Sequence, residues 1–281
     1  MILVTGAAGK TGRHVLRALS DAGLPARAFV RRPEQEDLVR QAGASEVTVG
    51  DLRDPETLDR ACEAVTGIYL ICPNLEIDEP AICVDLLRAA RASGTSHVVY
   101  HSVLHPQTTA MPHHLRKLQV EEALFESGLP FTILQPCAYL QNLEPYVDQA
   151  RADGELVLPF DVDAQLSMVD LRDVARIAAL VFEDPKVHRW ATYELCGAPV
   201  SHRQVAAALS RRLGRPIEAR SISVDQWCDT VTGLDARKVD ELARMFEYYD
   251  RFGFVGGSHV LSLLLGRPAL DLESFLDLLA M

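Results

Sequence analysis

The chain lacks the features that mark nucleic-acid-binding, secreted and membrane-spanning proteins. Its 281 residues include 28 Lys and Arg against 39 Asp and Glu, which gives a net charge of −11. This acidic balance argues against a nucleic-acid-binding surface. The start of the chain has no basic segment followed by a long apolar one, and no uncharged run is long enough to span a bilayer. We therefore expect a cytosolic protein with no nucleic-acid or membrane partner.

The sequence also lacks the motifs of a metal site. Its six cysteines include no CxxC pair, so we expect them to be reduced, several of them as small core residues. Four histidines lie near one another, but they form no tight helical ligand pair and no flanking Cys or Asp completes a ligand set. We therefore expect no metal. The residues concerned are Cys62, Cys72, Cys83, Cys137, Cys196 and Cys228, with His101, His105, His113 and His114.

The stretch GAAGKTG near the start has two possible interpretations. The pair Gly9-Lys10 resembles the end of a phosphate-binding P-loop, but that motif needs a glycine five residues earlier, where Val4 stands in an apolar run. A dinucleotide-binding turn fits better. Gly6 permits the tight turn, Gly9 lets a pyrophosphate approach the backbone, and Gly12 lets the following helix pack close to the strand.

In this interpretation Thr11 helps to start the helix, whose N–H groups and positive dipole end suit an anionic phosphate. The alternative is a glycine-rich turn that binds no ligand. The expected cofactor contacts in this segment are Gly6, Ala8, Gly9, Lys10, Thr11 and Gly12.

Short apolar runs alternate with helical patterns up to Pro136, which predicts an α/β fold with a doubly wound parallel sheet. The expected strands are residues 2–5, 26–30, 46–49, 67–72, 97–102 and 131–135. The expected helices are residues 12–22, 34–41, 55–64, 80–93 and 114–127.

The later pattern is less regular and predicts a smaller α+β lobe. We expect a dinucleotide-binding domain over residues 1–136 and a substrate lobe over residues 137–281, some of whose elements return to the first domain. Ser201 is expected to cap a helix. The expected later helices are 140–152, 173–182, 204–213, 236–250 and 273–279, with strands near 156, at 166–169 and at 192–195.

The ends of the second and third strands predict which cofactor binds. Arg31 and Arg32 follow the second strand, where an NAD-binding protein usually has an acidic residue. Their guanidinium groups suit a 2′-phosphate, so we expect NADP(H). Asp51 and Leu52, in GDLRD, are placed to line the adenine. Asp51 has an alternative role, to start the turn into the next helix.

Several segments together resemble the NmrA-like branch of the atypical short-chain dehydrogenases/reductases. They are TGAAGKTG, VRRP, GDLRD, KLQVEEALFESGLPFTILQPCAYLQN, VDLRDVA and GAPVSHRQVAAALSRRLGRPI. The resemblance implies a dinucleotide-binding domain with a small C-terminal lobe. The family includes NADPH-dependent quinone reductases, reductases of phenolic compounds, and regulators that bind a nicotinamide cofactor without turning it over.

The wider superfamily uses a Ser, a Tyr and a Lys, with the Tyr four residues before the Lys. The Tyr donates a proton, and the Lys lowers its pKa and holds the nicotinamide ribose. By resemblance, Ser102 and Lys117 occupy the Ser and Lys positions, but His113 stands where Tyr is expected. Either His113 transfers a proton near neutral pH, or it is an exposed residue at a helix start.

The resemblance also places Tyr139 and Asn142 beside the nicotinamide. Tyr139 supplies a ring or a hydroxyl there, or it is an ordinary half-buried aromatic residue. Pro73 and Asn74 complete the expected cofactor contacts.

Two functions follow from these observations. The first is an NADPH-dependent oxidoreductase that transfers hydride to a quinone or another conjugated carbonyl, a small-molecule substrate that can draw its protons from water. The second is a non-catalytic NADP(H) sensor that acts through a protein partner. The missing tyrosine favours the second, but it matters less for a quinone than for a simple ketone.

Overall fold

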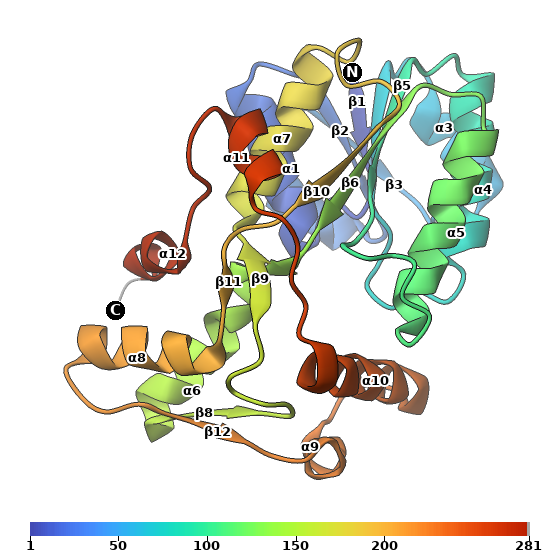
Figure 1. The fold of residues 1–281 in the computed structure, drawn as a ribbon. Coiled ribbons are helices and arrows are strands. Elements are labelled where there is room, and N and C mark those ends of the chain that lie inside the picture. Colours follow the sequence, from blue (N-terminus) through green and yellow to red (C-terminus); the bar gives the residue numbers. More distant parts are fainter. Residues whose placement is uncertain (280–281) are drawn as a thin grey trace. The chain divides into compact units, whose positions relative to one another are not determined.

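The computed structural model describes residues 1–279, and its largest sheet has seven strands (Figure 1). The strands lie in the order β10-β6-β5-β4-β1-β2-β3, and the pairings from β3 through β6 are parallel. The predicted doubly wound α/β fold is therefore confirmed. The strands are β1 Ile2–Val4, β2 Ala26–Val30, β3 Glu46–Val49, β4 Gly67–Leu70, β5 His97–His101, β6 Phe131–Pro136 and β10 Ala191–Leu195.

Helices cover both faces of this sheet. Helices α1 (Lys10–Asp21) and α7 (Leu171–Glu183) pack side by side on one face, and α3 (Pro55–Cys62), α4 (Glu79–Ala92) and α5 (Pro112–Glu126) lie on the other (Figure 1). Strands β4 and β5 are buried at every position, as expected for apolar strands enclosed by helices on both sides. The connection from β2 to β3 contains the 3-10 turn η1 (Pro33–Gln35) and α2 (Glu36–Gln41).

The strand order indicates where a ligand binds, at the carboxyl ends of the central strands, which we call the binding edge. The chain runs from β1 outward to β3 and then returns to β4 on the other side of β1. Ligands of such sheets bind at the carboxyl ends of the strands where the order reverses. The loops that follow β1, β2, β3 and β4 carry most of the predicted cofactor contacts.

The chain divides into two compact units. Residues 1–107, 113–135 and 171–193 form the first, and residues 108–112, 136–170 and 194–279 form the second. The second unit holds the sheets β11-β9-β7 and β12-β8. Its elements are β7 Ala138–Tyr139, η2 Leu140–Leu143, α6 Glu144–Asp153, β8 Glu155–Leu158, β9 Leu166–Val169, β11 Pro199–Val200, α8 His202–Leu213, β12 Glu218–Ser221, α9 Val224–Thr230, α10 Ala236–Phe252, α11 His259–Leu265 and α12 Leu272–Leu278.

The structure corrects some details of the sequence-based prediction. Helix α1 begins at Lys10 rather than Gly12, and its N-cap is Gly9 rather than Thr11, because the extended backbone of Gly9 ends the turn. The single helix expected at 140–152 is η2 followed by α6. The cap at Ser201 is confirmed: its hydroxyl accepts from the Gln204 N–H, and the Gln204 side chain accepts from the Ser201 N–H.

Candidate cofactor and active site

Three glycines shape the turn between β1 and α1, and they do so for different reasons. Gly6 has a φ of +57°, and a Cβ there would lie 2.9 Å from the Ile71 side chain. A Cβ at Gly12 would lie 2.4 Å from the Gly6 carbonyl oxygen. The fold therefore needs glycine at both positions.

Gly9 is different, because its backbone conformation does not require glycine. Its φ of −71° and ψ of 169° suit any residue. A Cβ there would have one tight neighbour, the Gly6 carbonyl oxygen at 3.2 Å, and no other atom within 4 Å. A glycine in an ordinary backbone conformation, at an otherwise open turn, fits the close approach of a ligand.

The N-terminus of α1 suits an anionic ligand. Gly9 and Lys10 are exposed, no side chain of the described residues caps this end, and the first turn has no acidic residue. The dipole and N–H groups of such a helix end attract phosphate. The residues present here therefore fit the pyrophosphate of a dinucleotide.

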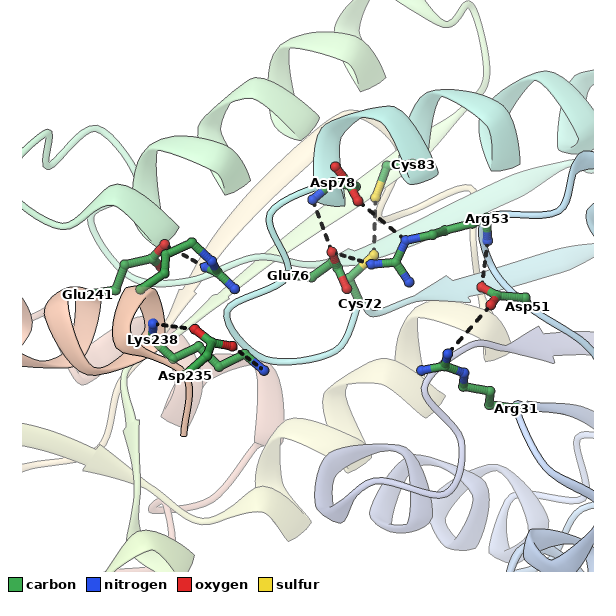
Figure 2. A network of polar contacts seen from close by, with 11 residues as sticks. Arg31, Asp51, Arg53, Cys72, Glu76, Asp78, Cys83, Asp235, Lys238 and Glu241 are labelled. Carbon is green, nitrogen blue, oxygen red and sulfur yellow. Dashed lines mark hydrogen bonds and ion pairs between the residues drawn. The ribbon is translucent and has the colours of Figure 1, made fainter. Parts of the chain in front are cut away.

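The arginine pair after β2 projects from a fixed turn. Gln35 accepts hydrogen bonds from the backbone N–H groups of Arg31 and Arg32 at 3.2 and 3.1 Å. The Arg31 guanidinium is exposed and lies 3.8 Å from an Asp51 oxygen (Figure 2). An exposed pair at this distance contributes little stability, so Arg31 can turn to an incoming phosphate at small cost.

Asp51 starts the turn after β3, which was one of its two expected roles. Its carboxylate accepts a hydrogen bond from the Arg53 N–H at 2.9 Å (Figure 2). Leu52 is half-buried against the core. The contact of Asp51 and Leu52 with an adenine stays a prediction.

An ion-pair network that the sequence did not predict joins the loops after β3 and β4. Arg53 contacts Glu76 at 2.6 Å and Asp78 at 3.3 Å (Figure 2). Pro73 and Asn74 lie exposed in the second of these loops. Arg53 therefore fixes the loop that carries two of the predicted cofactor contacts.

Lys117 lies on the inner side of α5 in a buried ion pair. Its ammonium group is 2.8 Å from Glu79 and donates to the His101 carbonyl at 3.4 Å. Glu79 is 2% exposed and also accepts a hydrogen bond from the Tyr100 hydroxyl at 3.0 Å. Glu79 was not predicted from the sequence, because 38 residues separate it from Lys117.

Ser102 is buried at the end of β5. Its hydroxyl donates to the carboxylate of Glu121, and the Gln135 amide donates to the same carboxylate at 2.9 and 3.1 Å. Burial raises the pKa of Glu121, while the bonds from Ser102 and Gln135 oppose this shift. The Ser102 hydroxyl therefore donates its proton to a buried carboxylate. Its catalytic role stays a prediction.

His113 lies four residues before Lys117 on α5 and is half-buried, not exposed. Its Nδ1 is buried and has no hydrogen-bond partner within residues 1–279. Burial, followed by the charges of Lys117 and Arg116, lowers the pKa of His113 to about 4. At this pKa the imidazole is mostly neutral at pH 7. The role of His113 in proton transfer stays a prediction.

Tyr139 and Asn142 belong to the second compact unit. Tyr139 is half-buried in β7, and Asn142 is exposed in η2. Their placement beside the nicotinamide stays a prediction.

Among the helices of residues 1–279, none combines the length and the apolar character that a membrane span requires.

Comparison with known proteins adds relatives that cover nearly the whole chain. An NAD(P)H azoreductase from Xenophilus azovorans is 29% identical over 98% of this chain and 96% of its own length. A (4-alkanoyl-5-oxo-2,5-dihydrofuran-3-yl)methyl phosphate reductase from Streptomyces griseus is 34% identical over 80% of this chain and 78% of its own.

Solved structures agree with these relatives. An NADPH-dependent quinone oxidoreductase from Escherichia coli, solved in complex with NADPH, superposes with a TM-score of 0.87 at 26% identity over 99% of both chains. NmrA, a negative transcriptional regulator, shares the fold with a TM-score of 0.81 at 22% identity over 99% of this chain and 95% of its own. The sequence profile of the NmrA-like family matches residues 1–275. The resemblance is confirmed, and the chain belongs to the NmrA-like family.

Proposed function

We propose that the chain is an NADPH-dependent oxidoreductase whose substrate is a quinone or another conjugated carbonyl. The observation that carries this proposal is the binding edge itself. It combines the open turn at Gly9, the uncapped start of α1 and the exposed pair Arg31 and Arg32. The relatives support the choice, because their names describe reductases that use NAD(P)H or reduce an oxo-dihydrofuran.

The residues of the site have distinct tasks in this proposal. Gly9 and the first turn of α1 bind the pyrophosphate, and Arg31 and Arg32 bind the 2′-phosphate. Lys117 binds the nicotinamide ribose, with its charge held in place by Glu79. Bound NADPH supplies the hydride. With His113 neutral at pH 7, the protons needed by the reduced substrate come from water, which suits an acceptor such as a quinone.

The direct test follows NADPH absorbance with a panel of quinones, azo dyes and aromatic enones. We expect slow oxidation of NADPH with at least one quinone or enone. A stable NADPH signal with every acceptor would overturn the proposed activity.

A regulatory role is the second candidate. It is favoured by the missing tyrosine at position 113 and by the fold shared with the regulator NmrA. In that case the protein binds NADPH, stays inactive across the panel, and changes its affinity for a protein partner with cofactor occupancy.

The arginine pair gives a prediction on cofactor choice. Wild-type protein should bind NADPH more tightly than NADH, and replacing Arg31 and Arg32 with Ala should weaken NADPH binding by about tenfold or more, since one charge-assisted contact is worth roughly 1.5–3 kcal/mol. NADH binding should change little. Calorimetry with both cofactors measures this, with Arg91→Ala, an exposed arginine in the last turn of α4, as the control. Equal wild-type affinities would contradict the prediction.

A second prediction concerns His113. A proton donor typically contributes about 10²–10⁴-fold to turnover, but an imidazole with a pKa of about 4 is a poor source of protons at pH 7. We therefore expect His113→Phe to lower turnover with a quinone less than about tenfold, with little change in NADPH affinity. Turnover and affinity should be measured on the same preparation. A loss of a hundredfold at unchanged affinity would make His113 the proton donor.

A further inference from the structure

Two buried cysteines lie together beside the loop that carries Pro73 and Asn74. The Sγ atoms of Cys72, after β4, and Cys83, in α4, are 3.7 Å apart (Figure 2). Cys83 is fully buried, and Cys72 is 7% exposed. Two thiols so close need only a small displacement to reach the S–S distance of about 2.05 Å.

A metal ion is a poorer occupant of this cluster. Ligand atoms of Cys72, Cys83 and Glu79 lie within 4.8 Å of one another, which is a plausible three-ligand set. Glu79, however, already holds the Lys117 ammonium group and the Tyr100 hydroxyl. A divalent cation would have to displace or tolerate the lysine charge in a buried site, whereas a disulfide adds no charge.

We propose that Cys72 and Cys83 form a reversible disulfide when the protein meets a peroxide. One thiol, as its thiolate, attacks a peroxide oxygen and becomes a sulfenic acid, and the O–O bond breaks to release water. The second thiol then attacks the sulfenic sulfur, which forms the S–S bond and releases a second water. Overall, two thiols are oxidised by two electrons and hydrogen peroxide is reduced to two waters.

The environment favours Cys72 as the first thiol. Burial, together with the neighbouring Cys72 sulfur, raises the pKa of Cys83 well above its ordinary value, so Cys83 rarely forms a thiolate. Cys72 is the more exposed of the two residues, at 7% against 0% for Cys83. The buried pair should therefore react slowly and respond to sustained oxidation.

The consequence of the disulfide rests on the proposed function. Shortening the sulfur distance pulls Cys72, near the start of the loop, toward α4, while Arg53 contacts the same loop at Glu76 and Asp78. The loop between these two attachments carries Pro73 and Asn74. The disulfide is expected to disturb their contact with NADPH and to lower its affinity.

The test treats the full-length protein with hydrogen peroxide, alkylates it under denaturing conditions and maps the peptides by mass spectrometry. We expect two of the six thiols to disappear and a linked peptide pair that contains Cys72 and Cys83. Dithiothreitol should restore both thiols. Cys83→Ser should form no such link, with Cys83→Ala as a second variant and Cys62→Ser, another buried cysteine, as the matched control that still forms it.

NADPH affinity is measured on the same samples. Oxidised wild-type protein should bind NADPH about tenfold more weakly, as when one hydrogen-bonded contact is lost, and dithiothreitol should reverse this. Oxidised Cys83→Ser should keep its affinity. Six remaining thiols, or a disulfide that does not join Cys72 to Cys83, would overturn the proposal. A Cys72–Cys83 link with unchanged affinity would overturn its effect on the loop. The peptide map does not depend on turnover, so failure of the proposed function remains a separate result.

Discussion

Replacing Gly9 with Val is expected to abolish NADPH binding and to leave the protein folded. We expect the fold to accept the side chain after a small shift, since Gly9 has an extended backbone and a Cβ there has one tight neighbour, the Gly6 carbonyl oxygen at 3.2 Å. The same side chain occupies the space through which a pyrophosphate approaches the start of α1. Losing about two charge-assisted hydrogen bonds should weaken binding roughly a hundredfold or more.

Calorimetry with NADPH and urea unfolding of the same variant separate the two effects. Gly257→Val is a matched control, because nothing lies within 4 Å of a Cβ there. Gly12→Ala is the opposite case and should destabilise the fold, since its Cβ would lie 2.4 Å from a backbone oxygen. Unchanged NADPH binding in folded Gly9→Val would refute the dinucleotide-binding turn. Binding of ATP in place of NADPH would support the P-loop instead.

The turn at Gly6 to Gly12 was predictable because its information is local. Three glycines at fixed spacing after an apolar strand specify a turn, a helix start and a close packing contact within a dozen residues. The alternation of apolar strands and helices up to Pro136 can also be recognised in short stretches of sequence, and this alternation predicts the parallel sheet.

The elements after Pro136 were less predictable because many are short. Strands β7 and β11 have two residues each, too few to show a period, and they exist through their pairing with β9. Strand β12 pairs with β8, which lies more than 60 residues earlier in the chain. A short stretch of sequence therefore cannot reveal that these two strands pair.

The polar surroundings of the site were not predictable for the same reason. Ser102 and Lys117 were found through their family positions, but their partners Glu121 and Glu79 look like ordinary helix residues in the sequence. Only the fold shows that both carboxylates are buried. Glu121 belongs to α5, and Glu79 lies in α4 and contacts Lys117 of α5. The low pKa of His113 likewise depends on this burial and on the charges beside it.

Lys117→Ala is expected to be strongly destabilising, and this must be separated from its effect on the cofactor. The substitution leaves Glu79 buried with the Tyr100 hydroxyl as its remaining partner of the two described here. Breaking a buried ion pair by removing one partner typically costs about 3–5 kcal/mol. We expect a loss near the lower end of this range, since the Lys117 side chain is 17% exposed.

The double variant Glu79→Gln with Lys117→Met should recover most of this stability. It removes both charges, keeps an acceptor for the Tyr100 hydroxyl and fills the space of the lysine stem. Urea unfolding of the wild type, Glu79→Gln, Lys117→Met and the double variant gives the coupling free energy between the two residues. Single and double variants of equal stability would show that the ion pair is not what stabilises this part of the fold.

NADPH titration of the double variant then isolates the role of Lys117 in binding, because the fold is intact and the ammonium group is absent. If Lys117 holds the nicotinamide ribose, affinity should fall about tenfold, the effect of one charge-assisted hydrogen bond. Glu79→Gln alone keeps the ammonium group and should bind NADPH much more tightly than the double variant. Wild-type affinity in the double variant would assign Lys117 to stability alone.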